Sequence, residues 1–154
     1  MRHTTPLSDI PALASKWCAR LGLEIEAGFE ESGEEQLFPN RMAVKGPDAH
    51  RLLAGKPQAL DALQYLLHEA QGEADDAKLV YLDVQGTRLF RMRELIAMSA
   101  IAAQKAKAAG SFVFESLTPK ERRWVHIAIS KEDGLDTCSE GLGATKSLKV
   151  FRKS

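Results

Sequence analysis

The chain is 154 residues long, 44% hydrophobic and 27% charged, which is typical of a globular protein rather than a disordered one. No apolar stretch approaches the roughly 20 residues of a membrane helix, and the N-terminal MRHTTPLSDIP lacks the apolar core of a signal peptide. The two cysteines, Cys18 and Cys138, form no CxxC motif and favour neither a zinc site nor a disulfide framework. We therefore expect a cytoplasmic protein without an integral membrane segment, metal or other cofactor.

The zero net charge conceals two halves of opposite sign. Residues 1–86 contain 8 Lys and Arg against 14 Asp and Glu, a net charge of −6. Residues 87–154 contain 13 Lys and Arg against 7 Asp and Glu, a net charge of +6. Such an asymmetry indicates two modules with different partners, of which the basic one suits a polyanion. We therefore expect two domains, 1–86 and 87–154.

In the acidic half, the spacing of apolar residues predicts a helix, two strands, a helix and a strand. These elements cover residues 8–21, 23–31, 36–46, 59–70 and 77–84, in that order. Leu13, Trp17 and Leu21 are expected on the buried face of the first helix, and Phe29 on the buried face of the first strand. Asp83 is assigned to a solvated strand end rather than to a metal site. The order of the elements predicts an α/β sandwich.

The basic half begins with a long helix that Gly110 ends as a C-cap. After it we expect a strand, a second helix and two further strands, the last two joined by the glycine-containing loop EGLGAT. The five elements cover residues 88–109, 111–117, 119–131, 135–139 and 147–152. Together, the halves predict an α+β fold of two small α/β sandwich modules, the second with a mixed sheet covered by helices.

The segment SLTPKERRWVHIAI carries the clearest local signal. Thr118 is a good N-cap, Pro119 suits the first helical position, and Glu121 follows the cap by three residues, which predicts a capping box. Arg122 and His126 are four residues apart and so share one face of the helix. An arginine offers a planar fork to a phosphate, and a histidine one turn later can donate a second hydrogen bond.

The other side chains of this helix predict which side faces the solvent. Trp124, Ile127 and Ala128 are expected toward the core, while Lys120 and Arg123 flank the exposed face. Helical spacing is a weak signal, and by itself it favours a solvated face with a structural hydrogen bond over a phosphate site.

A family resemblance favours the phosphate site. PKERRWVHIAI, followed by LDTCSEG and a basic strand, resembles the R-3-H domain, which is named for an Arg and a His separated by three residues and binds single-stranded nucleic acid. GPDAHRLLAGKPQALDALQYLL in the first half resembles a type II KH domain. Together they resemble the bacterial SpoIIIJ-associated (Jag) family of RNA-binding proteins. The resemblance covers about residues 8–152, in a short form without the additional N-terminal domain of many members.

The resemblance implies a set of contact residues. Arg122 and His126 match the signature Arg and His, Ser139 and Gly141 match a Thr-x-Ser-x-Gly strand end, and Lys146 stands about where the family tends to have an Arg. With the neighbouring cations added, the predicted nucleic-acid-binding residues are Arg122, His126, Arg123, Lys120, Ser139, Lys146, Arg88 and Lys56.

The loop by which KH domains grip a nucleic-acid backbone is altered in this sequence. That loop is GXXG, because glycine lets the sugar-phosphate chain approach closely. The ungapped alignment gives Ala54-Gly55-Lys56-Pro57, and a shifted one gives Gly55-Lys56-Pro57-Gln58, which keeps one glycine. Acidic residues in the neighbouring strand and turn would also repel phosphate. We therefore expect a structural or protein-binding KH-like module, in which Lys56 makes at most one phosphate contact.

These observations predict a non-enzymatic protein that binds single-stranded RNA, or DNA, through the helix of Arg122 and His126, with a role in post-transcriptional regulation. The alternative is a protein-interaction adaptor whose acidic half docks another KH-domain protein or membrane-insertion machinery. The two functions are compatible, because each would use a different half of the chain.

Overall fold

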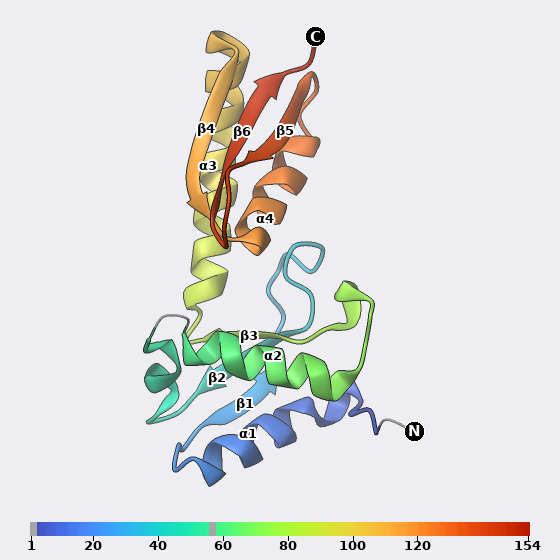
Figure 1. Cartoon of the computed structure of the whole chain (residues 1–154), viewed down its shortest axis with the longest axis vertical. Helices are drawn as coiled ribbons and strands as arrows, with labels where there is room; N and C mark the ends of the chain where they lie inside the picture. Colours follow the sequence, from blue (N-terminus) through green and yellow to red (C-terminus); the bar gives the residue numbers. More distant parts are fainter. Residues whose placement is uncertain (1–2, 56–57) are drawn as a thin grey trace. The chain divides into compact units, whose positions relative to one another are not determined.

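Two three-stranded sheets organise the chain in the computed structural model, which describes residues 3–55 and 58–154 (Figure 1). Each sheet belongs to one of two units, Met1–Leu89 and Phe90–Ser154. Both units combine helices with a sheet, so the predicted α+β fold is confirmed. No helix within the described ranges is long and apolar enough to cross a membrane.

The first unit has the element order that the sequence predicts. Its elements are η1 (Leu7–Asp9), α1 (Ile10–Arg20), β1 (Glu26–Phe29), β2 (Arg41–Lys45), η2 (Ala49–Leu53), α2 (Ala59–Gln71), η3 (Asp76–Lys78) and β3 (Tyr81–Val84). Strand β1 is antiparallel to β2, and β2 is parallel to β3. Helices α1 and α2 cover one face of this sheet, because their buried residues form one core cluster with Met42, Val44, Leu82 and Val84.

Helix α1 buries a different stripe from the predicted one. Its buried residues are Ile10, Ala14 and Cys18, while Leu13 and Trp17 lie half-buried at the edge of the core. Leu21 is 77% exposed, so its assignment to the core was wrong. Leu21 is the C-cap of the helix, where the chain turns away, and the last position of a helical stripe therefore has no core to face.

The second strand is shorter than the sequence predicts. Residues 36–40 form turns rather than strand, and Leu37 and Phe38 are buried within them. Asn40 has a positive φ of 51°, and its side-chain amide donates to the carbonyl oxygens of Ala77 and Leu79 at 2.7 and 3.2 Å. A left-handed residue held by its own side chain interrupts the extended backbone, so β2 begins at residue 41.

Phe29, predicted to face inward, is 42% exposed at the end of β1.

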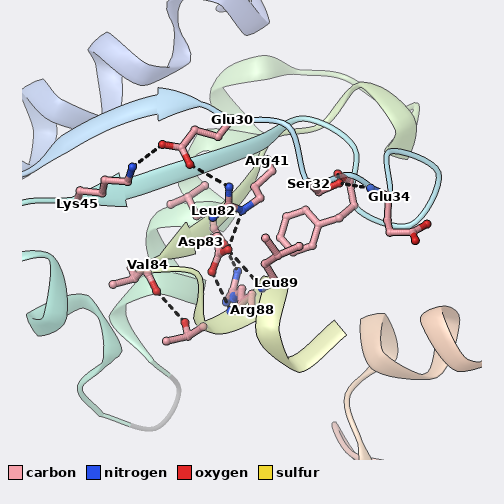
Figure 2. A network of polar contacts seen from close by, with 12 residues as sticks. Glu30, Ser32, Glu34, Arg41, Lys45, Leu82, Asp83, Val84, Arg88 and Leu89 are labelled. Carbon is pink, nitrogen blue, oxygen red and sulfur yellow. Dashed lines mark hydrogen bonds and ion pairs between the residues drawn. The ribbon is translucent and has the colours of Figure 1, made fainter. Parts of the chain in front are cut away.

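Asp83 is fully buried rather than solvated, and it lies in the network of polar contacts that Figure 2 shows. Its carboxylate accepts hydrogen bonds from Arg41 Nε at 2.8 Å and from the backbone N–H groups of Arg88 and Leu89 at 2.8 and 3.3 Å. Arg41 is itself buried and donates a second hydrogen bond to Glu30 at 3.2 Å. The negative charge is thus compensated by a guanidinium and by the first turn of the next helix.

The second unit is a two-layer arrangement of helices on a sheet. Its elements are α3 (Thr87–Ala109), β4 (Ser111–Leu117), α4 (Pro119–Ser130), β5 (Leu135–Glu140) and β6 (Lys146–Arg152). The start of α3, up to Leu89, belongs to the first unit. The sheet has the order β4-β6-β5 and is antiparallel throughout, not mixed as predicted. Gly110 ends α3 with a φ of 96°, as expected of a C-cap.

Helices α3 and α4 cover the same face of this sheet (Figure 1). Phe114 and Leu148 face each other across β4 and β6 and are both buried there. From α4, the residues buried against them are Trp124, Val125 and Ile129. Ile127 and Ala128, which the sequence places toward the core, are only half-buried.

Candidate nucleic-acid interface

The predicted capping box at the start of α4 is present. The Thr118 hydroxyl accepts a hydrogen bond from the Glu121 N–H at 3.3 Å, and the Glu121 carboxylate accepts one from the Thr118 N–H at 2.9 Å. Glu121 also accepts a hydrogen bond from Arg91 Nε of α3 at 3.0 Å. Hydrogen bonds to Glu94 and Glu121 raise the pKa of Arg91. The register of α4 and its attachment to α3 are therefore fixed by the same glutamate.

Arg122 is anchored at one nitrogen. Its Nη1 donates a hydrogen bond to the carbonyl oxygen of Leu117 at 2.7 Å, and the residue is half-buried. A guanidinium carries five N–H donors, so one hydrogen bond to a carbonyl restrains the side chain while leaving most of the fork to other acceptors. A fork that is oriented before binding loses less side-chain entropy when a phosphate arrives.

The Leu117 carbonyl owes its position to an irregularity in β4. The pairing of β4 with β6 shifts register between Phe114 and Leu117, and Ser116 has a positive φ of 55°. After this bulge, Leu117 pairs with Lys146 at the start of β6. Bulges commonly redirect the side chains beside them. Here the bulge brings the anchor of Arg122 and the backbone of Lys146 to adjacent strand positions.

His126 is exposed and is oriented by a residue of the sheet. Its Nδ1 lies 2.5 Å from the hydroxyl oxygen of Thr137 on β5. This contact leaves the other ring nitrogen, Nε2, to point away from the strand. Thr137 is absent from the predicted set, although it is the first residue of the Thr-x-Ser-x-Gly pattern. Period-two alternation, which puts Thr137 and Ser139 on one face of β5, is the signal that could have identified it.

The other predicted residues of the second unit lie on α4, at the end of β5 and, for Lys146, at the start of β6. Lys120 is half-buried with its Nζ 5.8 Å from the centre of the Trp124 ring, which is a cation–π contact. Arg123 is exposed on the same helix. Ser139 and Gly141 are exposed at the end of β5, where Gly141 has a φ of 112° that favours glycine.

Two predicted cations do not belong to this group. Arg88 lies in the first unit, where its guanidinium forms an ion pair with Asp61 and donates to Gln64 at 2.8 Å and to the Leu82 carbonyl at 3.1 Å. Its donors are thus directed at acceptors of its own unit. Lys56, like Pro57 of the altered loop, lies outside the described residues.

The second unit therefore presents an Arg and a His, one helical turn apart and each oriented by a neighbouring strand, in a helix-on-sheet domain. Residues 93–152 match the family model of the R3H domain, a span that includes both side chains. The chain is also similar to the RNA-binding protein KhpB of Clostridium symbiosum, with 28% identity over 123 residues. That alignment covers 79% of this chain and 54% of the relative, so the chain spans about half the length of the curated relative it matches.

Proposed function

We propose that this protein binds single-stranded nucleic acid, RNA in preference to DNA, through Arg122 and His126. The observation that carries the proposal is the double anchoring of this pair, Arg122 on the Leu117 carbonyl and His126 on the Thr137 hydroxyl. The match of residues 93–152 to the R3H domain and the name of the KhpB relative support it. The role is binding without a catalytic step, in the cytoplasm.

The chemistry of the pair suits the phosphates of a flexible strand. The Arg122 fork can donate two parallel hydrogen bonds to one phosphate, and His126 Nε2 can donate to the same or the next one. Arg123, Lys120 and Lys146 add positive charge around them. Contacts of this kind position a strand without identifying its bases, so we expect weak sequence preference.

We further propose that the first unit is a KH-like domain, within 1–86, that contributes little to this affinity, and that 87–154 form the nucleic-acid-binding domain. The element order of α1, β1, β2, η2, α2 and β3 is compatible with a KH-like unit. Glu24, Glu26, Glu31 and Glu34 are exposed there and would repel phosphate.

Titration of a labelled single-stranded oligonucleotide tests the proposal. Affinity should fall for Arg122→Ala and for His126→Ala, and further for the double variant. The slope of log affinity against log salt should be roughly −0.7 per phosphate contacted, and Arg122→Ala should make it less steep by about that amount. Paired measurements on oligo-U and oligo-dT check the preference for RNA, since only RNA offers the 2′-hydroxyl.

Lys131 provides a matched control. It is an exposed cation at the C-cap of the same helix, so Lys131→Ala removes the same charge at the opposite end of α4. Affinity should be nearly unchanged in this variant. Equal losses of affinity for Lys131→Ala and Arg122→Ala would show that binding depends on net charge rather than on a specific site. Unchanged affinity of the double variant of Arg122 and His126 would refute the proposal.

A further inference from the structure

Helix α3 is apolar on two opposite sides. One side packs within the second unit through residues that include Met92, Leu95 and Ala102. The opposite side carries a row of exposed apolar residues, which we call the α3 stripe: Phe90, Ala97, Ile101 and Ala108. At 3.6 residues per turn, all four lie within about 20° of one line along the helix. Phe90 is 72% and Ile101 is 54% exposed, so the stripe places two large apolar side chains on one solvent-facing line of the helix.

The α3 stripe is complementary to itself when two copies run in opposite directions. Large and small side chains alternate along it, in the order Phe90, Ala97, Ile101, Ala108, and the order is balanced about residue 99. A twofold axis at that point sets Phe90 against Ala108 of a second copy and Ile101 against Ala97. Large residues thus meet small ones, as close packing of two helices requires. A parallel arrangement would instead set each residue against itself.

The charges beside the stripe favour the same arrangement. Glu94 and Lys105 lie on one flank, about 40° and 60° from the line of Phe90. In the antiparallel arrangement Glu94 meets Lys105 of the second copy at both ends, because an antiparallel twofold axis brings the same flank of the two helices together. Glu94 binds Arg91 at 2.8 Å but keeps 45% of its side chain exposed. Lys105 is exposed with its Nζ 5.6 Å from the Phe112 ring centre, so both remain at the surface.

We infer that the α3 stripe is a homodimer interface, in which α3 of one copy packs antiparallel against α3 of a second copy. The isologous contact uses one patch on both subunits, which is the commonest symmetry of soluble oligomers. The dimer carries two copies of the Arg122 and His126 pair, and a strand long enough to reach both would gain affinity from the second, tethered contact. The interface itself does not depend on nucleic-acid binding.

Mass measurement of the full chain by sedimentation equilibrium, without nucleic acid, tests this inference. The protein should pass from monomer to dimer as concentration rises, and Ile101→Asp should abolish the transition because it puts a charge at the centre of the stripe. Leu142→Asp is the matched control: Leu142 is 96% exposed, lies on the β5–β6 loop, and should leave dimerisation intact. A wild-type protein that stays monomeric up to about 1 mM overturns the inference. So does a dimer that Ile101→Asp leaves intact while circular dichroism shows a folded chain.

A charge swap separates the antiparallel dimer from other arrangements. Glu94→Lys and Lys105→Glu should each weaken dimerisation, roughly tenfold, because each makes two symmetry-related pairs repulsive. The double swap should restore the wild-type dissociation constant. Failure of the double swap to restore it overturns the antiparallel register, and dimerisation unaffected by any of the three charge variants overturns the interface.

Discussion

The arginines of the two units meet different acceptors. In the first unit, Arg41 is buried against Asp83 (Figure 2), and Arg88 is paired with Asp61, so both cations neutralise carboxylates of their own unit. In the second, Arg122 is oriented by the neutral carbonyl of Leu117, which compensates none of its charge. The second unit also contains an arginine that is paired with carboxylates, since Arg91 binds Glu94 and Glu121. A count of positive charges therefore overestimates how many cations are available to bind a polyanion. The acceptors near each cation decide whether it remains available.

The largest expected effect is on the buried pair. Asp83→Ala should lower the free energy of unfolding by about 3–5 kcal/mol, because it removes the buried charge partner of Arg41 and leaves the guanidinium only the partly exposed Glu30. It also removes the acceptor for the N–H groups of Arg88 and Leu89. Chemical denaturation measures the change. Asp76→Ala, at an exposed acid of the same unit, should alter stability by no more than about 0.5 kcal/mol. A loss below about 1 kcal/mol for Asp83→Ala would contradict this account.

The next largest effect is on oligonucleotide affinity, where Arg122 and Arg88 should differ. Arg122→Ala should weaken oligonucleotide binding roughly 10- to 100-fold, the value of a charge-assisted hydrogen bond. Arg88→Ala should change it less than about twofold, because its donors already face Asp61, Gln64 and Leu82. Fluorescence anisotropy at fixed salt measures both. Arg122→Lys tests the fork, since it keeps the charge and should recover only part of the affinity. Equal losses for Arg88→Ala and Arg122→Ala would remove the distinction between the two units.

A smaller effect is expected at the helix cap. Thr118→Ala should lower the stability of the second unit by about 1 kcal/mol, because the Glu121 N–H loses its acceptor. Thr118→Ser keeps a hydroxyl at the same position and should restore most of that loss. Thermal denaturation followed by circular dichroism measures both variants. Identical melting temperatures for Thr118→Ala and the wild type would show that the capping box does not hold α4 in place.

The smallest effect is on the acid stability of the first unit. Hydrogen bonds from Lys45 and then Arg41 lower the pKa of Glu30 below its ordinary value of about 4.5. A lowered pKa in the folded state gives stability that is present above the unfolded pKa and is lost as pH falls through the folded one. The stability difference between wild type and Glu30→Gln should therefore be present at neutral pH and vanish in acid. A constant difference across denaturation curves from pH 7 to pH 3 would contradict this.

Local signals predicted the second unit better than the first. Pro119, Thr118 and Glu121 define the start of α4 within five residues of sequence, and both hydrogen bonds of the capping box form. Gly110 similarly ends α3 where a left-handed residue is needed. The first unit depends on contacts between distant segments, such as Asn40 with residues 77 and 79. A periodicity within one segment carries no information about such contacts, which is why the start of β2 was misplaced.

The candidate site likewise has one feature that local sequence predicts and another that depends on distant contacts. The spacing of Arg122 and His126 on one helix face follows from sequence, since helical periodicity is local. The anchors of the two side chains do not, because Leu117 and Thr137 are brought to them by a strand bulge and by the packing of α4 against the sheet. Where the sequence pattern includes an anchor, as with Thr137, its role becomes visible only when β5 lies beside α4.

The sequence by itself determined the order of the main elements, the capped helix and the shared face of its Arg and His, since each depends on residues within a few positions of one another. The tertiary structure alone decided which charges are available. Asp83 looked solvated and is buried, Arg88 looked available and is paired, and Arg122 is anchored by a neutral carbonyl. The physical reason is that the energy of a charge depends on the solvent and the acceptors around it, and in a folded chain those acceptors come from distant residues.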